Sequence, residues 1–266
     1  MIYGIAGKII NLYRLVFARP LFYKFNKLLW LCSLHGMGIL NSENDSVSGE
    51  ANFLKRILVG EDSPIILDVG SNIGRYTKKV LANNPTAIVY AFEPHPQTFQ
   101  ELSKNMAGIK NVYTICSAVG SDDGVVSLYD YASSDGSSHA SIYKGVIEDV
   151  HHAPSIRHET ALTKLDTFCR AKGINKIFLL KVDVEGNELE VLRGLQFYIA
   201  NNLVQIIHFE FNEMNVVSRV FFSDFCAQLT DYEFYRLLPN GMIPLGRYQG
   251  LSHEIFAYQN IVAFLK

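Results

Sequence analysis

The sequence predicts an α/β protein with a doubly wound, mostly parallel sheet of seven strands. Short apolar runs, such as residues 65–68, 87–92 and 176–184, have the length and composition of buried strands. Stretches with apolar residues at helical spacing separate these runs. Strands that alternate with helices are typical of a parallel sheet covered by helices on both faces. The last two predicted strands, 232–238 and 255–265, should form an antiparallel pair.

The chain is expected to consist of an N-terminal helical extension, residues 1–45, and one main domain, residues 46–266. A polar segment, 41–49, breaks the apolar periodicity and marks the join. The predicted elements of the main domain are, in order, a helix at 50–58, the first strand, a helix at 75–84, a strand at 87–92, a helix at 95–106, strands at 112–119 and 125–129, a loop-rich stretch at 130–158, a helix at 165–172, a strand at 176–184, a helix at 188–199, a strand at 203–211, a helix at 218–229 and the two closing strands.

A chain of 266 residues can bury a sizeable core, and its formal net charge of −2 gives no indication of a nucleic-acid partner. The four cysteines lie far apart and include no Cys-x-x-Cys pair. This spacing argues against a zinc site or a disulfide framework and fits a reducing, cytoplasmic location. No apolar run approaches the ~20 residues of a membrane-spanning helix. Recurring charges also argue against a secretory signal.

The first forty residues differ from the rest in charge, because they contain five Lys or Arg residues and no Asp or Glu. They also contain seven aromatic residues. Three interpretations stay open: a helical cap on the main domain or on a second subunit, a basic amphipathic helix at an anionic membrane surface, and a cleaved organellar presequence. The apolar residues at helical spacing before Pro20 are Ile5, Ile9, Leu12 and Val16.

The segment around Gly70 carries most of the functional information. An apolar strand ends on Asp68 and opens into a turn that holds Gly70 and Gly74, ahead of a predicted helix. Glycines let the backbone approach a ligand, and a helix N-terminus offers free N–H groups. The next strand ends on Glu93, where a carboxylate can accept hydrogen bonds from a ribose diol. The pattern predicts a nucleoside-cofactor site; the alternative is an ordinary strand-turn-helix unit with a buried aspartate.

The glycine spacing discriminates between cofactors. A dinucleotide fold requires G-x-G-x-x-G, but three residues separate Gly70 from Gly74, and the middle glycine is missing. Asp68 would repel a pyrophosphate, whereas it would attract a sulfonium and an α-amino group. The sequence therefore favours S-adenosyl-L-methionine over NAD.

A second group of polar residues follows another buried strand. Lys181 and Asp183 lie two residues apart and therefore on one face, and Gly186 makes the turn into a predicted helix. Ligands of open α/β sheets bind beyond the carboxyl ends of the strands. Asp183 is therefore expected in the same crevice as Asp68 and Glu93.

With these residues in view, the chain resembles the FkbM-type methyltransferases, a family with the class I, Rossmann-like, S-adenosylmethionine-dependent fold. The resemblance covers residues 52–264 and leaves out the basic extension. In combination the matching motifs are specific. They lie at residues 67–74, 92–94, 118–120, 165–166, 180–188 and 191–194.

The resemblance implies methyl transfer from S-adenosyl-L-methionine to an acceptor oxygen, commonly a hydroxyl on a sugar, a glycan or another natural product. It does not fix the acceptor. The residues that it assigns to the cofactor, from the methionine end through the ribose to the adenine, are Asp68, Gly70, Asn72, Gly74, Glu93, Ser117 and Ala118.

An alcohol acceptor has to lose a proton, so the reaction requires a base within hydrogen-bond reach. Asp183 is the first candidate, with Lys181 to tune its charge and Glu210, at the end of the next strand, to contact the acceptor. Asp183 could instead bind the amino group of the cofactor. No metal is expected, although Asp183, Glu210 and Asn212 would offer oxygen ligands to Mg²⁺. His139, in a polar loop, is a further candidate for the acceptor pocket.

The sequence thus predicts a cytoplasmic O-methyltransferase that uses S-adenosyl-L-methionine and acts on a small-molecule or glycan acceptor. Residues 1–40 are expected to provide self-association or peripheral membrane contact. Two alternatives stay open: an NAD-dependent dehydrogenase or epimerase, and a membrane-docked cofactor-binding protein without turnover.

Overall fold

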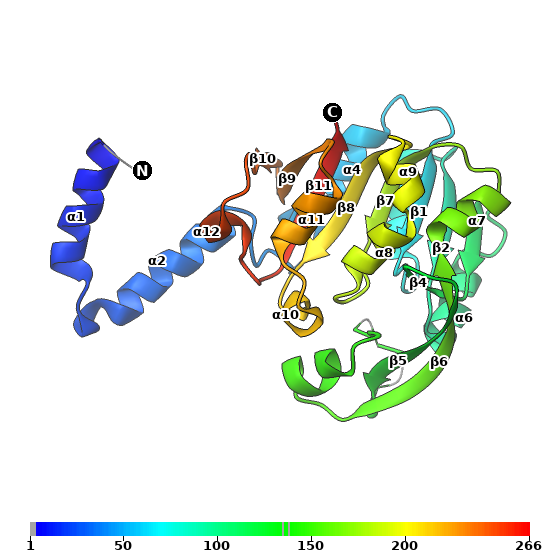
Figure 1. Ribbon diagram of the computed structural model, residues 1–266, viewed down its shortest axis with the longest axis horizontal. Helices are drawn as coiled ribbons and strands as arrows, with labels where there is room; N and C mark the ends of the chain where they lie inside the picture. Colours follow the sequence, from blue (N-terminus) through cyan, green and yellow to red (C-terminus); the bar gives the residue numbers. More distant parts are fainter. Residues whose placement is uncertain (1–3, 135, 138) are drawn as a thin grey trace.

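The computed structural model describes residues 4–134, 136–137 and 139–266. Its main sheet has eight strands in the order β10-β9-β11-β8-β7-β1-β2-β3 (Figure 1). The five strands from β8 to β3 are parallel, and β9, β10 and β11 are antiparallel to their neighbours. The strands are β1 Ile65–Val69, β2 Ile88–Phe92, β3 Val112–Ile115, β7 Ile177–Val182, β8 Val204–Phe211, β9 Tyr232–Leu238, β10 Gly241–Pro244 and β11 Gln259–Leu265.

The doubly wound, mostly parallel sheet and its C-terminal antiparallel pair, β9 with β11, are confirmed. The predicted number of seven strands is wrong, because β10 pairs with β9 across a two-residue turn, Pro239 and Asn240, and extends the antiparallel edge. β10 is only four residues long, and one of them is a proline, so its sequence has no strand pattern.

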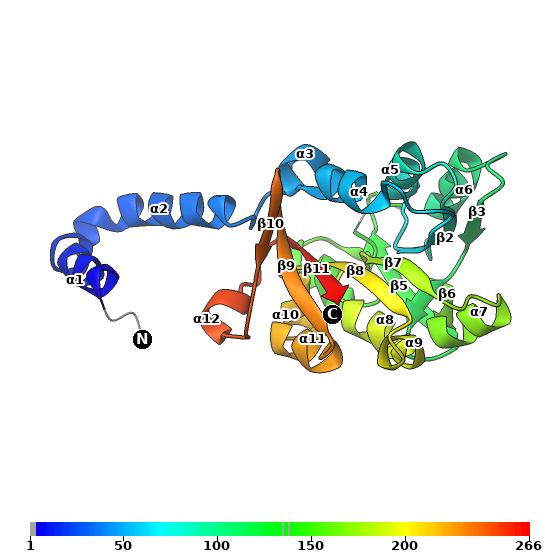
Figure 2. The ribbon, with the colours of Figure 1, turned by 90° about the horizontal axis from the view of Figure 1, so that it is seen from above.

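Helices cover both faces of the main sheet (Figure 2). On one face, Leu54 and Val80 pack against Ile66 of β1. On the other, Phe225 packs in a cluster that includes Leu67 of β1. Neighbouring β1 residues point to opposite faces, so this five-residue strand supports both cores. The helices of the first face are α4 Glu50–Leu58, α5 Arg75–Asn83 and α6 Pro96–Asn105; those of the second are α7 Leu165–Ala171, α8 Glu188–Gly194, α9 Gln196–Ala200 and α11 Phe222–Gln228.

A second, three-stranded sheet has the order β4-β6-β5. Its strands are β4 Ala118–Gly120, β5 Gly124–Tyr131 and β6 Ser155–Lys164. The single strand predicted at 112–119 is therefore wrong, since its two halves belong to different sheets. The stretch predicted as loop, 130–158, contains the start of β6 and the one-turn helix η2, Val146–Val150. β6 alternates polar and charged residues and is half-exposed, so it lacks the apolar signature of a buried strand.

Two predicted helices are each replaced by two shorter ones. Residues 188–199 form α8 and α9, and the region near 218–229 holds α10, Met214–Ser218, and α11. Gly194 ends α8 where the chain touches the second sheet: a Cβ there would lie 2.0 Å from the carbonyl oxygen of Gly120. α12, Gly250–His253, precedes β11.

The N-terminal arm, defined as residues 4–36, projects away from the sheet (Figures 1 and 2). It consists of α1 Ile5–Phe17, η1 Pro20–Phe22 and α2 Tyr23–Gly36. The arm joins the body through Ile39, which bridges to Gln259, and through the N–H of Leu40, which donates to the carbonyl of Tyr258 at 2.7 Å. The predicted linker contains a short helix, α3 Asp45–Ser48, capped by Asn44. The boundary at residue 45 stays a prediction.

Candidate functional site

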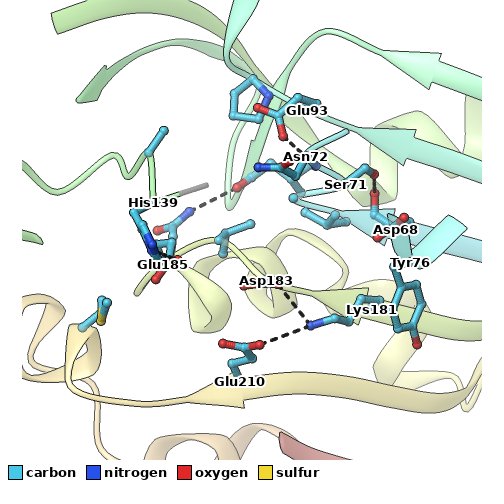
Figure 3. A pocket seen from close by; sticks show the side chains of 18 of the residues that line it. Asp68, Ser71, Asn72, Tyr76, Glu93, His139, Lys181, Asp183, Glu185 and Glu210 are labelled. Carbon is cyan, nitrogen blue, oxygen red and sulfur yellow. Dashed lines mark hydrogen bonds and ion pairs between the residues drawn. The ribbon is translucent and has the colours of Figure 1, made fainter. Parts of the chain in front are cut away.

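A cavity of about 520 Å³ lies at the carboxyl ends of β1, β2, β7 and β8 (Figure 3). The connection between β5 and β6 forms another part of its wall and contributes Ser137, His139, Ile142 and His151. All of the predicted site residues except Gly74 line this cavity. The topology therefore brings together side chains that are up to 142 positions apart in the chain, from Asp68 to Glu210.

The turn after β1 requires glycine. Gly70 has φ +80°, and a Cβ there would lie 1.7 Å from the carbonyl oxygen of Asp183 in the turn after β7. Asp183 donates its N–H to the carbonyl of Val69, so the two turns are in direct contact. Gly74 has φ +85°, and a Cβ there would meet Met106 and Leu102 of the α6 region. Gly70 thus brings the two cavity-lining turns together, whereas Gly74 fits α5 against α6.

Asp68 lies at the base of the cavity and is almost fully buried. Its Oδ2 accepts a hydrogen bond of 2.6 Å from the Thr77 hydroxyl of α5. Burial raises the pKa of Asp68 to about 6, against the opposing effects of the Thr77 hydrogen bond and the Lys181 ammonium. A cationic ligand would restore the charged form. Thr77 was not predicted, because only the packing of α5 against β1 brings its hydroxyl to Asp68.

Glu93 lies at the end of β2 and is buried. Its Oε2 accepts the N–H of Asn72 at 2.9 Å, and its Oε1 accepts the N–H of His95 at 2.9 Å. The two backbone groups fix the plane of the carboxylate. Burial outweighs both hydrogen bonds and raises the pKa of Glu93 to about 7. Asn72 has φ +48°, a backbone conformation that turns its N–H toward Glu93.

Ser117 and Ala118 lie at the start of β4 and line the cavity beyond Glu93. The Ser117 hydroxyl contacts the Thr163 hydroxyl at 2.8 Å and donates toward backbone carbonyls of Ala118 and Ala161 at 2.8 and 3.0 Å. These partners belong to the second sheet. The side chain of Ser117 therefore fastens that sheet to the cavity wall.

Lys181, Asp183 and Glu210 form a charged cluster on β7 and β8 (Figure 3). The Lys181 ammonium lies 3.5 Å from the Asp183 carboxylate and 4.0 Å from that of Glu210. Its Nζ is buried and has no hydrogen-bond partner in the described part of the chain. Burial lowers the pKa of Lys181, but the two carboxylates outweigh it and hold the pKa above its ordinary value.

Glu210 differs from Asp183 in its surroundings. Burial, and then the nearby charge of Asp183, raise the pKa of Glu210 well above its ordinary value. Side-chain exposure is 14% for Glu210 and 37% for Asp183. The more exposed carboxylate lies nearer to the Lys181 ammonium, and burial favours the protonated form of the more buried one. The cluster therefore offers a carboxylate paired with a cation beside a second carboxyl group that favours its proton.

His139 and Glu185 connect the β5–β6 segment to the turn after β7 (Figure 3). His139 Nδ1 lies 3.1 Å from Glu185 Oε1, and the hydroxyl of Ser141 donates to the carbonyl of Glu185 at 2.8 Å. The hydrogen bond to Glu185 raises the pKa of His139. Both side chains line the cavity, and Glu185 has φ +53°. Glu185 was not among the predicted site residues, because the residue that it contacts, His139, is 46 positions away in the sequence.

Among the described residues, no group of three or more His, Cys, Asp or Glu side chains is arranged to hold a metal ion. Asn212, the third ligand considered for Mg²⁺, uses its Oδ1 to accept the N–H of Met214 at 3.0 Å. This hydrogen bond fits a structural role for Asn212 at the end of β8.

Tyr258 lines the cavity and was missed, because it precedes β11 and has no local motif. Its hydroxyl accepts from Asn260 Nδ2 at 3.0 Å, and Asn260 Oδ1 lies 2.9 Å from His208 Nε2. His208 Nδ1 in turn lies 3.2 Å from the hydroxyl of Tyr76. Burial lowers the pKa of His208 well below its ordinary value. His208 is therefore a neutral core residue behind the cavity.

Comparison with known proteins identifies relatives of this chain. A family profile described as the methyltransferase FkbM domain matches residues 68–234, more than half of the chain. "Methyltransferase 1" of Beauveria bassiana is 31% identical over 147 residues, which are 50% of this chain and 59% of that protein. The hexuronic acid methyltransferase AglP of Haloferax volcanii is 29% identical over 171 residues, 63% of each chain.

An O-methyltransferase from Bacillus cereus, solved in complex with SAH, aligns over 91% of this chain and 90% of its own with a TM-score of 0.45 and 10% identity. The chain spans less than two thirds of the length of the two relatives that it matches. The profile match covers the cavity-lining ends of β1, β2, β7 and β8. The chain belongs to the FkbM methyltransferase family.

Proposed function

We propose that this protein is an S-adenosyl-L-methionine-dependent O-methyltransferase that acts on a hydroxyl of a sugar or a similar neutral natural product. The observation that supports this best is the cavity itself. It combines a buried carboxylate fixed by two backbone N–H groups, Glu93, with a buried acid, Asp68, and a lysine–carboxylate cluster around Asp183. The family supports methyl transfer as the reaction class.

The residues at the ends of β1 and β2 fit the proposed cofactor. The oxygens of Glu93 are held in one plane by the N–H groups of Asn72 and His95, a geometry suited to a ribose diol. Asp68 offers a buried negative charge for the sulfonium and the α-amino group. Gly70 leaves the backbone open on that side. Ala118 and the backbone of Ser117 would flank the adenine.

The bound cofactor supplies an electrophilic methyl group, and the protein has to position and deprotonate the acceptor. The Asp183 carboxylate accepts the proton of the acceptor hydroxyl. The Lys181 ammonium lies 3.5 Å from the Asp183 carboxylate, so it can hold that carboxylate in place and offset its negative charge. Glu210 keeps its own proton, because burial raises its pKa, and can donate a hydrogen bond to a second oxygen of the acceptor.

The charge of the cavity favours a neutral acceptor. Three cationic side chains, Arg75, Lys79 and Lys181, line it together with seven carboxyl groups. Two of these cations are already paired, Lys79 with Glu50 at 2.9 Å and Lys181 with Asp183. A carboxylate on the acceptor would therefore be repelled. The hexuronic acid methyltransferase relative suggests a sugar, and the charge suggests that the sugar is uncharged. The cavity carboxyls are Glu50, Asp68, Glu93, Asp183, Glu185, Glu210 and Glu213.

Thermal unfolding of the full chain with S-adenosyl-L-methionine, S-adenosylhomocysteine and NAD in parallel tests the cofactor. A ligand at 100 times its dissociation constant stabilises the native state by about 2.7 kcal/mol. This should raise the midpoint by roughly 5 to 10 °C in a domain of this size. We expect that shift with the two adenosyl ligands and none with NAD. A shift with NAD alone, or with no ligand, would contradict the proposal.

Cofactor affinity should depend on pH. Asp68 and Glu93 have pKa values near 6 and 7, both raised by burial, and a cationic ligand prefers their charged forms. Affinity is therefore expected to increase between about pH 5 and 8, by up to tenfold per pH unit for each group that titrates. The unliganded protein should show the opposite trend. Each folded pKa lies above its ordinary value, so this part of the stability is present below about pH 4 and is lost as the pH rises to about 7.

Isothermal titration of S-adenosyl-L-methionine at several pH values measures this dependence. Glu93→Gln is expected to bind more weakly, because its amide group would face the N–H of Asn72 or of His95. Its affinity should also stop rising near pH 7, since only Asp68 still titrates. The same affinity at every pH in the unmodified protein would refute the roles of both carboxylates.

A further inference from the structure

The N-terminal arm leaves a continuous apolar stripe uncovered. No residue of α1 is buried. Contacts within the arm use Phe17, which lies outside the stripe: its ring lies 5.0 Å from that of Phe22 and 5.6 Å from that of Phe25, and Asn26 donates to the Phe17 carbonyl at 3.0 Å. The stripe residues and their exposed fractions are Ile5 80%, Ile9 61%, Leu12 65% and Val16 43%.

α2 extends this apolar surface toward the body. Leu28 and Trp30 are each 58% exposed, and Tyr23 is 66% exposed. Only Leu34, near the end of α2, is buried. Side chains of this size are not left in water over two successive helices without a partner surface. The arm therefore has the features of an interaction surface.

The charge of the arm indicates which kind of surface it binds. The arm contains five Lys or Arg residues and no Asp or Glu. Lys8 lies one helical turn from both Ile5 and Leu12, at the edge of the stripe, and Lys24 and Lys27 are exposed on α2. Pairing with the arm of a second copy would bring ten positive charges together with no acid to neutralise them. An anionic lipid surface satisfies both the apolar stripe and the cations.

We propose that the N-terminal arm docks on an anionic lipid bilayer, with the α1 stripe and the exposed side chains of α2 at the headgroup boundary. No helix in the described residues is long and apolar enough to cross a bilayer, so the arm lies along the surface. It joins the body at Tyr258, through the Leu40 hydrogen bond, and both Tyr258 and Ser42 line the cavity. Docking holds the cavity near the membrane surface. The proposal does not depend on the proposed function.

Trp30 is the only tryptophan of the chain, so selectively excited tryptophan emission of the unlabelled protein reports on the arm alone. The full chain is titrated with vesicles of phosphatidylcholine, and with vesicles of phosphatidylcholine mixed with phosphatidylglycerol. We expect a blue shift and co-sedimentation with the mixed vesicles only, both weakened by added salt. An unchanged Trp30 spectrum with the anionic vesicles would overturn the proposal.

Variants separate the apolar from the electrostatic contribution. Ile9→Glu with Leu12→Glu should abolish binding, and Lys24→Gln with Lys27→Gln should weaken it by about fivefold for each charge removed. The matched controls, Val125→Glu and Lys110→Gln, change exposed residues of the body and should bind as the unmodified chain does. No α1 residue is buried, so the substitutions leave the core intact. Equal loss in the controls would overturn the proposal. So would a dimer in solution that Ile9→Glu with Leu12→Glu dissociates, together with no vesicle binding.

Discussion

Replacing Gly70 with alanine should weaken cofactor binding and destabilise the fold. The backbone φ of +80° costs an L-residue about 1–2 kcal/mol. The new Cβ would also lie 1.7 Å from the Asp183 carbonyl oxygen, so the turns after β1 and β7 would have to separate. We expect the free energy of unfolding to fall by at least about 3 kcal/mol in total, which is among the larger effects of single substitutions. A displacement of this kind near reacting groups reduces turnover on the order of 100-fold.

Gly60→Ala is the matched control. Gly60 also has positive φ, +82°, but no atom lies within 4 Å of its would-be Cβ. It should therefore show only the backbone penalty and keep full cofactor affinity. The two variants are compared by thermal unfolding and by titration with S-adenosyl-L-methionine. Equal effects in both would mean that the contact between the two turns does not shape the site.

Asp183→Asn should reduce turnover by about 10² to 10⁴-fold while cofactor affinity stays within a few-fold of the original. An amide has the same shape as the carboxylate but cannot accept the acceptor proton. The loss should fall on the chemical step, because Asp183 contacts Lys181 rather than the Glu93 end of the cavity. Release of S-adenosylhomocysteine with neutral sugar acceptors measures turnover, and calorimetry measures cofactor binding.

Asp122→Asn makes the same chemical change in an exposed turn of the second sheet, so its turnover should be unaffected. Lost cofactor affinity in Asp183→Asn would show instead that Asp183 binds the amino group of the cofactor. Retained turnover would exclude Asp183 as the base and direct attention to His139, another titratable group that lines the cavity. The three outcomes are separated by measuring kcat and cofactor affinity on the same protein.

The parallel sheet and the cofactor end of the site could be predicted because their signals are local. Asp68, Gly70 and Glu93 follow directly on apolar strands, and the carboxyl ends of neighbouring parallel strands meet at one edge of a sheet. Gly70 and Asp183 also lie close together because they follow directly on β1 and β7, which are neighbouring strands of the sheet. The residue types at the strand ends and the order of the strands were therefore enough to predict this part of the site.

The remaining features of the fold and of the site depend on contacts between segments that are far apart in the sequence. The ends of β5 and β6 are polar, and β10 at the sheet edge is short. Only their pairing with neighbouring strands identifies these segments as strands, because their composition does not. Tyr258 reaches the cavity from the segment just before β11, and His139 contacts Glu185, 46 positions further along the chain. The free energies of ionisation also depend on burial, which raises the pKa of Glu93 and Glu210.

By itself, then, the sequence determined the fold class and the residues at the strand ends, because strand and turn preferences act over a few residues. The basic charge of the arm was also visible in the sequence. Only the tertiary structure decided that the arm stands away from the body with Ile5 and Leu12 exposed. Whether an apolar helical face is covered depends on how the whole chain packs, which helical periodicity does not encode.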